Sequence, residues 1–240
     1  MLKSERATCF AFLVAATMAA TGCTGVSPFD ADGPTVAAPV YAAGDRWVYR
    51  AQDGFMTPVV WEETHEIVAV GNDGISVRVT QRGPTVNTVR TEQLAGPGRV
   101  RVGALFDEET RRFEQELKRY DFPLVPGKRW NQWIGNFNEQ TKKPGEINRY
   151  VSVGGWRRII TPAGAFDAIA LRVYMHLDDE EFWRDRTACT YLLWYAPAVR
   201  AVVREEKEAQ YRETSGRHDT AAIRSQHALI ELVAYSPAAR

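Results

Sequence analysis

The feature that most constrains the fold is a period-two alternation of apolar and polar residues that recurs along the chain. In GISVRVTQ, Ile75, Val77 and Val79 share one face of an extended segment, and polar residues occupy the other face. The runs AFDAIALRVYMHL and HALIELVAY alternate in the same way, and Gly, Pro, Asn and Asp separate such runs. Successive strand residues point to opposite faces, so the pattern predicts antiparallel strands. We therefore expect an all-β fold with few helices.

One segment is compatible with either a helix or a strand. In ETRRFEQELKRYDF, Phe113, Leu117 and Tyr120 stand at helical spacing, while Phe113 and Leu117 also share a strand face. We favour a strand because the neighbouring segments read as strands.

The N-terminal residues have a different composition. A basic start with Lys3 and Arg6 precedes a mostly apolar or small run over residues 7–20. The run is shorter than the roughly 20 apolar residues that span a bilayer. This arrangement predicts a secretory signal peptide over residues 1–22. Residues 23–40, rich in Pro, Gly and Ala, then predict a flexible tether, and residues 41–240 a single β-rich domain.

The end of the signal resembles the lipobox of bacterial lipoproteins. Small residues, Ala-Thr-Gly, precede Cys23, although Ala20 stands where that family usually has Leu. The resemblance implies a diacylglyceryl thioether on Cys23, cleavage before it, and acylation of the new amino group by a chain such as palmitate. Several acyl chains give a stable membrane anchor, whereas one is marginal. The alternative is an ordinary signal peptidase site with a chance Cys.

The resemblance also bears on the compartment. Thr24 is the residue directly after the lipidation position. Among lipoproteins of enteric bacteria, an Asp at this second position signals retention in the inner membrane, and Thr24 is not an Asp. We therefore expect an outer-membrane anchor facing the periplasm, with the inner membrane as the alternative. Cys189 remains in the domain within an apolar run, which predicts a small buried hydrophobe.

A short phrase occurs twice, as AAGDRWVYR and as VPGKRWNQW. Gly44 and Gly127 can take the dihedrals needed to turn into a strand, and Trp47 and Trp130 follow three residues later. We interpret both phrases as strand starts at which a Trp packs against the core. A pair of aromatic ligand-binding positions is the alternative.

Four phrases in order, GDRWVY, FPLVPGKRW, TPAGAFDAI and WYAPAVRAVV, resemble a broad group of secreted bacterial proteins of unknown function. The resemblance covers about residues 41–208. It implies a single domain built on a strongly curved antiparallel sheet or half-barrel, loosely similar to periplasmic lipoprotein carriers. It supplies no catalytic residue. Ala198 and Arg200 replace the two glycines usual in the last phrase.

The chain shows no recognisable catalytic or metal-binding motif. His65, His176, His218 and His227 have no metal-site spacing, and each reads as a surface or satisfied core histidine. The acidic run HLDDEEF reads as a solvated hairpin tip. Adjacent carboxylates such as Glu62 with Glu63, or Glu205 with Glu206, would point to opposite faces of a strand. We expect no catalytic residue, no metal and no cofactor, and no enzymatic activity.

Charge excludes one class of partner. Lys plus Arg and Asp plus Glu both number 30, and no basic stripe with interleaved aromatics is present, which argues against nucleic-acid binding.

The sequence therefore predicts a lipid-anchored envelope protein that acts as a structural or interaction component with an envelope protein partner. The alternative is a carrier or sensor of an apolar ligand on the concave side of the sheet. We expect bulky aromatics to fill that side, and any cavity to lie between the halves that begin at Trp47 and Trp130.

Overall fold

The computed structural model describes residues 32–54, 58–106, 109–181, 184–213 and 223–238. The predicted signal peptide (1–22) and the lipidation position Cys23 lie outside the described residues.

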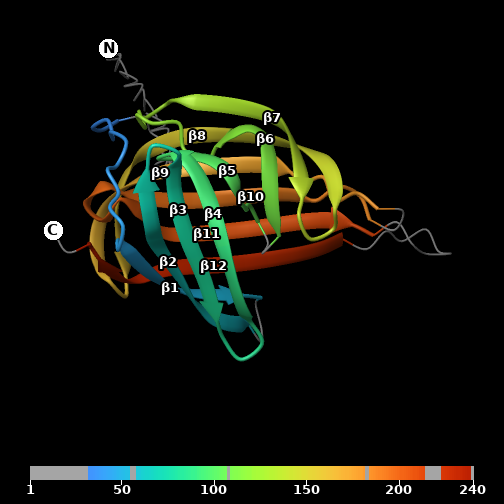
Figure 1. The fold of residues 1–240 in the computed structure, drawn as a ribbon, viewed down its shortest axis with the longest axis horizontal. Coiled ribbons are helices and arrows are strands. Elements are labelled where there is room, and N and C mark those ends of the chain that lie inside the picture. Colours follow the sequence, from blue (N-terminus) through green and yellow to red (C-terminus); the bar gives the residue numbers. More distant parts are fainter. Residues whose placement is uncertain (1–31, 55–57, 107–108, 182–183, 214–222, 239–240) are drawn as a thin grey trace, which may run out of the picture.

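Twelve antiparallel strands in sequential order close into a barrel, and one short 3₁₀ turn interrupts them (Figure 1). The elements are β1 (Arg46–Asp53), β2 (Val59–Gly71), β3 (Gly74–Arg82), β4 (Asn87–Gly96), β5 (Arg99–Ala104), β6 (Thr110–Lys118), β7 (Arg129–Asn138), β8 (Lys143–Thr161), β9 (Gly164–His176), β10 (Ala188–Ala196), η1 (Pro197–Val199), β11 (Ala201–Arg212) and β12 (Ile223–Ser236). The all-β prediction is confirmed, and the ambiguous segment is strand β6.

The sequence predicts a strongly curved sheet or half-barrel, but the sheet closes completely into a barrel. β1 pairs with β12 from Arg46 with Ser236 to Asp53 with Ala228, so neither terminal strand leaves an open edge. An exposed edge presents unpaired backbone groups, and closure satisfies them. In Figure 1, β2, β3 and β4 cross in front of the strands of the second half, so two walls face each other across the interior.

A weakly paired seam in the described barrel lies between β6 and β7. Only three residue pairs join these strands, from Arg111 with Asn138 to Phe113 with Asn136. Further along, side chains bridge the gap. Gln132 accepts a hydrogen bond from the Lys118 amide (2.6 Å) and donates one to the Glu116 carbonyl (3.0 Å).

The repeated phrase marks two strand starts with the same backbone geometry. Gly44 (φ 97°) and Gly127 (φ 85°) both occupy the left-handed region. The Gly44 amide donates to the carbonyl of Ile67 on β2 (2.8 Å), and the Gly127 amide donates to the carbonyl of Val153 on β8 (2.9 Å). In each case the next residue's carbonyl accepts a hydrogen bond back from the same partner residue (both 2.9 Å). The phrase therefore has an architectural role.

The similarity continues beyond the strand starts. The β2–β3 turn ends at Gly74 (φ 124°) and the β8–β9 turn ends at Gly164 (φ 130°). The β4–β5 and β10–β11 connections both contain a residue with positive φ, Gly98 (φ 76°) and Arg200 (φ 57°). The barrel thus consists of two six-stranded halves, β1–β6 and β7–β12, with turns of the same kind in corresponding places.

Arg200 adopts a left-handed backbone conformation (φ 57°), and its side chain contacts neighbouring segments. Its guanidinium forms an ion pair with Asp45 (2.7 Å) and lies over the Tyr235 ring (5.7 Å). Three parts of the chain are therefore joined at the end of the barrel where β1 begins.

The last residues of the predicted tether lie against the barrel. Val36 is buried and exchanges two backbone hydrogen bonds with Leu124 (2.9 and 2.8 Å), and Trp156 donates to the Pro34 carbonyl (3.0 Å). Any free length of tether between a membrane anchor and the barrel therefore ends before Val36.

In the part of the chain that the structure describes, no helix is long and apolar enough to cross a bilayer.

Candidate functional site

The barrel encloses a cavity of about 430 Å³. Its wall is built by inward-facing residues of β1–β5, β8 and β10–β12, and so by both halves of the barrel. This confirms the expected location. Trp47 lies in the wall, whereas Trp130 does not line the cavity.

The expectation that aromatics would fill the interior is wrong, because a cavity remains although aromatic rings cluster where β1 begins. Trp47 stacks on Tyr235 (5.6 Å between ring centroids) and meets Tyr41 edge-on (5.8 Å). Nearby, Tyr195 packs against Tyr120 (5.8 Å) and Phe122 (5.6 Å). Burial raises the pKa of Tyr120 to about 12, so its hydroxyl stays neutral at physiological pH. A further stacked ring pair also lines the lumen, which nevertheless stays open.

Apolar residues form one part of the cavity wall. They come from strands of both halves and alternate with outward-facing polar residues, as in β3. They include Ile67, Val77, Leu94, Val100, Leu193 and Ile230.

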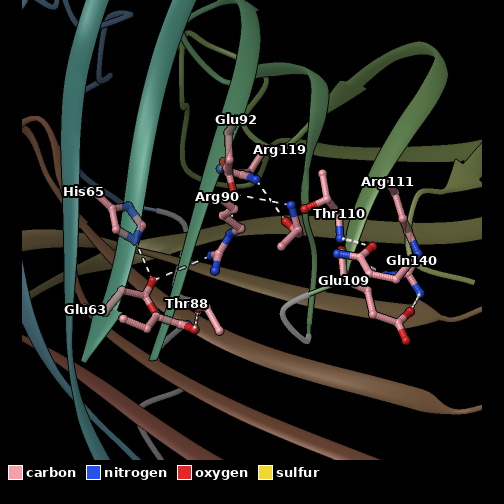
Figure 2. Close-up of polar contacts among 12 residues, drawn as sticks. Glu63, His65, Thr88, Arg90, Glu92, Glu109, Thr110, Arg111, Arg119 and Gln140 are labelled. Atoms are coloured by element: carbon pink, nitrogen blue, oxygen red, sulfur yellow. Dashed lines mark hydrogen bonds and ion pairs between the residues drawn. The ribbon is translucent and has the colours of Figure 1, made fainter. Parts of the chain in front are cut away.

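A second part of the wall is charged, and Glu63 on β2 is its centre (Figure 2). The Glu63 carboxylate, 6% exposed, lies 2.5 Å from Nε2 of His65 and accepts a hydrogen bond from Gln81 (2.7 Å). Nη2 of Arg90 on β4 lies 4.0 Å from Oε1 of Glu63. Burial alone would raise the pKa of Glu63, but the hydrogen bond with His65 and the charges of His65, Arg90 and Lys207 outweigh it and hold the pKa well below its usual range.

The network continues from β4 to the segment after β6. Glu92 is buried and accepts a hydrogen bond from Nη1 of Arg119 (2.8 Å), and Arg90 Nε lies 3.6 Å from it. Burial opposes ionisation here too, but the charges of Arg119 and Arg90 lower the pKa of Glu92. Figure 2 shows Arg90 between the two glutamates. On β11, Glu205 is paired with Lys207 (3.1 Å), which also lies over the Tyr191 ring (5.8 Å).

Arg149 on β8 differs from the basic residues above, because it is not paired with a carboxylate of the described chain. It is 3% exposed, and it donates to the carbonyls of Lys118 (2.9 Å) and Arg119 (3.3 Å) across the β6–β7 seam. Its Nε has no hydrogen-bond partner, and no carboxylate of the described chain forms an ion pair with it. Burial, reinforced by the like charge of Arg119, lowers the pKa of Arg149 to about 10, so the guanidinium remains charged at neutral pH.

The sequence predictions for individual residues have mixed outcomes. Cys189 is buried, as predicted. Adjacent carboxylates do face opposite ways, since Glu62 is exposed and Glu63 is buried in the lumen. The acidic run after β9 is not a fully solvated tip. Asp178 accepts a hydrogen bond from Asn136 (2.8 Å), and Asp179 accepts one from the Thr187 amide (2.8 Å). Both carboxylates therefore satisfy buried donors.

Sequence reasoning missed the charged lumen, although a signal was present. Charged or polar residues occur two apart in β2, β4 and β11, as Glu63 with His65, Arg90 with Glu92 and Glu205 with Lys207. Each pair continues, at the same spacing, into apolar positions that face inward. This pattern is typical of a strand whose inner face is polar at one end and apolar at the other.

No metal site can be assembled from the residues that the structure describes, since no three metal-ligating side chains gather in one place.

No protein-family model and no curated protein matches this sequence. Two solved structures are similar in fold. One is a candidate exported protein with a YmcC-like fold from Bacteroides fragilis NCTC 9343, with 13% identity, a TM-score of 0.50, and coverage of 84% of this chain and 99% of that chain. The other is a candidate lipoprotein from Parabacteroides distasonis ATCC 8503, with 12% identity, a TM-score of 0.47, and coverage of 85% and 100% respectively. At such low identity, the likeness concerns the all-β fold alone.

Proposed function

We propose that the barrel is a non-enzymatic carrier or sensor that holds a small, largely apolar molecule in its lumen. The observation that carries this proposal is the cavity of about 430 Å³ between the two halves. Small-molecule sites have volumes of about 300–1,000 Å³ and combine apolar walls with a few placed polar groups. The apolar part of the wall favours contact with an apolar molecule over water.

The proposal can be tested with N-phenyl-1-naphthylamine, a neutral apolar probe that becomes fluorescent in apolar surroundings. The chain from Thr24 onward is suitable, because every strand begins at Arg46 or later and the described contacts begin at Pro34. We expect saturable binding of the probe by the wild-type protein. Mass spectrometry of molecules that co-purify with the same protein would identify its natural ligand.

Variants that fill the lumen make the test specific. Ala228 lines the cavity, whereas Ala234 on the same strand is exposed outside the barrel. Ala228→Phe should weaken probe binding at least tenfold, and Ala234→Phe should leave it unchanged. Ile230→Trp is a second filling variant in case the first one unfolds. Equal probe binding by folded filling variants and the control would rule out the lumen as the site.

A role as an interaction component is the second candidate, and an aromatic patch on the outer face favours it. Trp133 on β7 is 62% exposed, and Tyr150 and Tyr174 are exposed at paired positions of β8 and β9. Exposed aromatics are enriched at protein interfaces. Photo-crosslinking in cells from position 133, with Arg101 as the control position, should capture one defined envelope protein if this face is used. Equal labelling from both positions would argue against it.

For location, we propose a lipid anchor at Cys23 in the outer membrane, with the barrel facing the periplasm. The lipobox-like end of the predicted signal supports this location.

A further inference from the structure

The lumen wall contains a buried arginine, Arg149, that forms no ion pair with a carboxylate of the described residues. Glu63 is balanced by His65 and Arg90, Glu92 by Arg119, and Glu205 by Lys207. Arg149 lines the same cavity, and the described chain places no carboxylate within ion-pair distance of its guanidinium. Among the described residues, Asp53 at the end of β1 is the remaining acidic residue in the wall, and it accepts a hydrogen bond from Gln226.

Burying a charged guanidinium such as that of Arg149 is energetically unfavourable unless its hydrogen-bond donors find acceptors. Two backbone carbonyls satisfy Nη1 and Nη2 of Arg149 but leave its Nε–H unpaired. Arg90, also in the wall, has Nε–H and Nη1–H groups without hydrogen bonds. A buried ion without a counter-charge is strongly unfavourable, and arginine forms its best contacts with planar or tetrahedral oxyanions.

We propose that the ligand is an amphiphile with a single anionic head group, such as a long-chain carboxylate, which binds at Arg149. This inference rests on the proposed carrier function. The head group accepts hydrogen bonds from the unpaired donors in the charged part of the wall. The apolar remainder lies against Ile67, Val77, Leu94 and Ile230, which form the other part. The lumen therefore has a binding surface for each end of such a molecule.

A purely structural role for Arg149 makes a different prediction. Its bonds to the carbonyls of Lys118 and Arg119 help to close the β6–β7 seam. If that were its whole role, removing the side chain would affect charged and neutral ligands equally.

The test compares dodecanoate with dodecan-1-ol, which has the same chain length and no charge. Each compound displaces N-phenyl-1-naphthylamine from the chain beginning at Thr24 at pH 7. For the wild-type protein we expect dodecanoate to bind at least tenfold more tightly than dodecan-1-ol. In Arg149→Met, dodecanoate affinity should fall about 10- to 100-fold, the range for a charge-assisted contact, while dodecan-1-ol affinity changes less than threefold.

Two further variants complete the comparison. Arg149→Lys keeps the charge and should retain part of the preference for the acid. Arg129→Met removes an exposed arginine of β7 and should behave as wild type. Equal affinity of the wild-type protein for the two ligands would overturn the proposal even if Arg149→Met fails to fold. So would an equal loss for both ligands in folded Arg149→Met.

The outcomes separate this inference from the carrier function itself. If the neutral probe and the alcohol bind but the acid is not preferred, the lumen binds apolar molecules and the head-group assignment is wrong. If nothing displaces the probe, or the probe does not bind, the carrier function fails as well.

Discussion

The two tryptophans of the repeated phrase begin equivalent strands but are buried to different extents. Trp47 is 3% exposed, and its Nε1 donates to the Val199 carbonyl (2.7 Å). Trp130 is half-buried, and its Nε1 donates to the Lys118 carbonyl (3.1 Å) at the β6–β7 seam. At equivalent positions, Trp47 therefore packs in the core of one half, whereas Trp130 covers a seam in the other.

We predict that Trp47→Ala lowers the free energy of unfolding by about 3–5 kcal/mol, the usual range for a buried aromatic. Trp130→Ala should cost less, because part of that ring is already in water. Trp133→Ala, at an exposed position of β7, is the control and should stay within about 0.5 kcal/mol of wild type. Urea unfolding curves give all three values, and equal losses for Trp47 and Trp133 would contradict the packing account.

Glu63 should make the stability of the barrel depend on pH. Its pKa is lowered in the folded state, so its contribution to stability is fully present above the ordinary carboxyl pKa of about 4.3 and is lost as the pH falls below it. We expect Glu63→Gln to destabilise the protein by about 1–3 kcal/mol at pH 7 and to lose less stability in acid than wild type. Melting temperatures between pH 3 and pH 7 test this, with Glu62→Gln on the outer face as the control. Parallel profiles for Glu63→Gln and wild type would show that the carboxylate is not responsible.

Among the elements, the turns before β1 and β7 depend on glycine for the same physical reason. Gly44 (φ 97°) and Gly127 (φ 85°) adopt a conformation that L-residues with a side chain avoid. Gly44→Ala and Gly127→Ala should each reduce stability by about 1–2 kcal/mol. Gly71→Ala is the matched control, since Gly71 lacks a positive φ and a methyl group there would meet open space. Chemical denaturation measures the differences, and a loss for Gly71→Ala as large as the others would remove the conformational explanation.

The seam between β6 and β7 should be the first part of the described barrel to open. Residues 114–116 of β6 pair with neither β5 nor β7, whereas residues 150–152 of β8 pair with strands on both sides. Local opening follows the density of such contacts. We expect amide hydrogens of residues 114–116 to exchange with solvent at least tenfold faster than those of residues 150–152. Hydrogen exchange followed by mass spectrometry measures this, and equal protection of the two segments would contradict it.

At the scale of the whole molecule, local features were predictable from sequence and long-range ones were not. The alternation in β3 and the glycines before β1 and β7 identified strands and strand starts, because each depends on residues close together in the chain. Barrel closure depends on the pairing of β1 with β12, and the sequence of neither strand identifies the other as its partner. The same limit applies to the candidate site. Glu63 and Arg149 are far apart in sequence, and only the closed barrel places both in one lumen.

The proposed anchor gives a prediction for the intact protein. If Cys23 is acylated, the wild-type chain should incorporate labelled palmitate and sediment with membranes, and Cys23→Ala should lose both properties. Cys189→Ala, inside the barrel, is the control and should keep them. Wild-type protein found free in the periplasmic fraction would contradict the anchor.

The pairing of the first strand with the last also determines the order in which this chain can fold. Eleven of the twelve strand pairings in the described barrel join neighbours in sequence, so each can form as soon as its second strand has been synthesised. The remaining one brings Arg46 to Ser236 and must wait for the final strand. Until then, β1 and the most recently formed strand both present unpaired backbone edges, which are templates for aggregation. A chain that stops before β12 would keep both edges permanently, so a nascent barrel is exposed to self-association until its synthesis is complete.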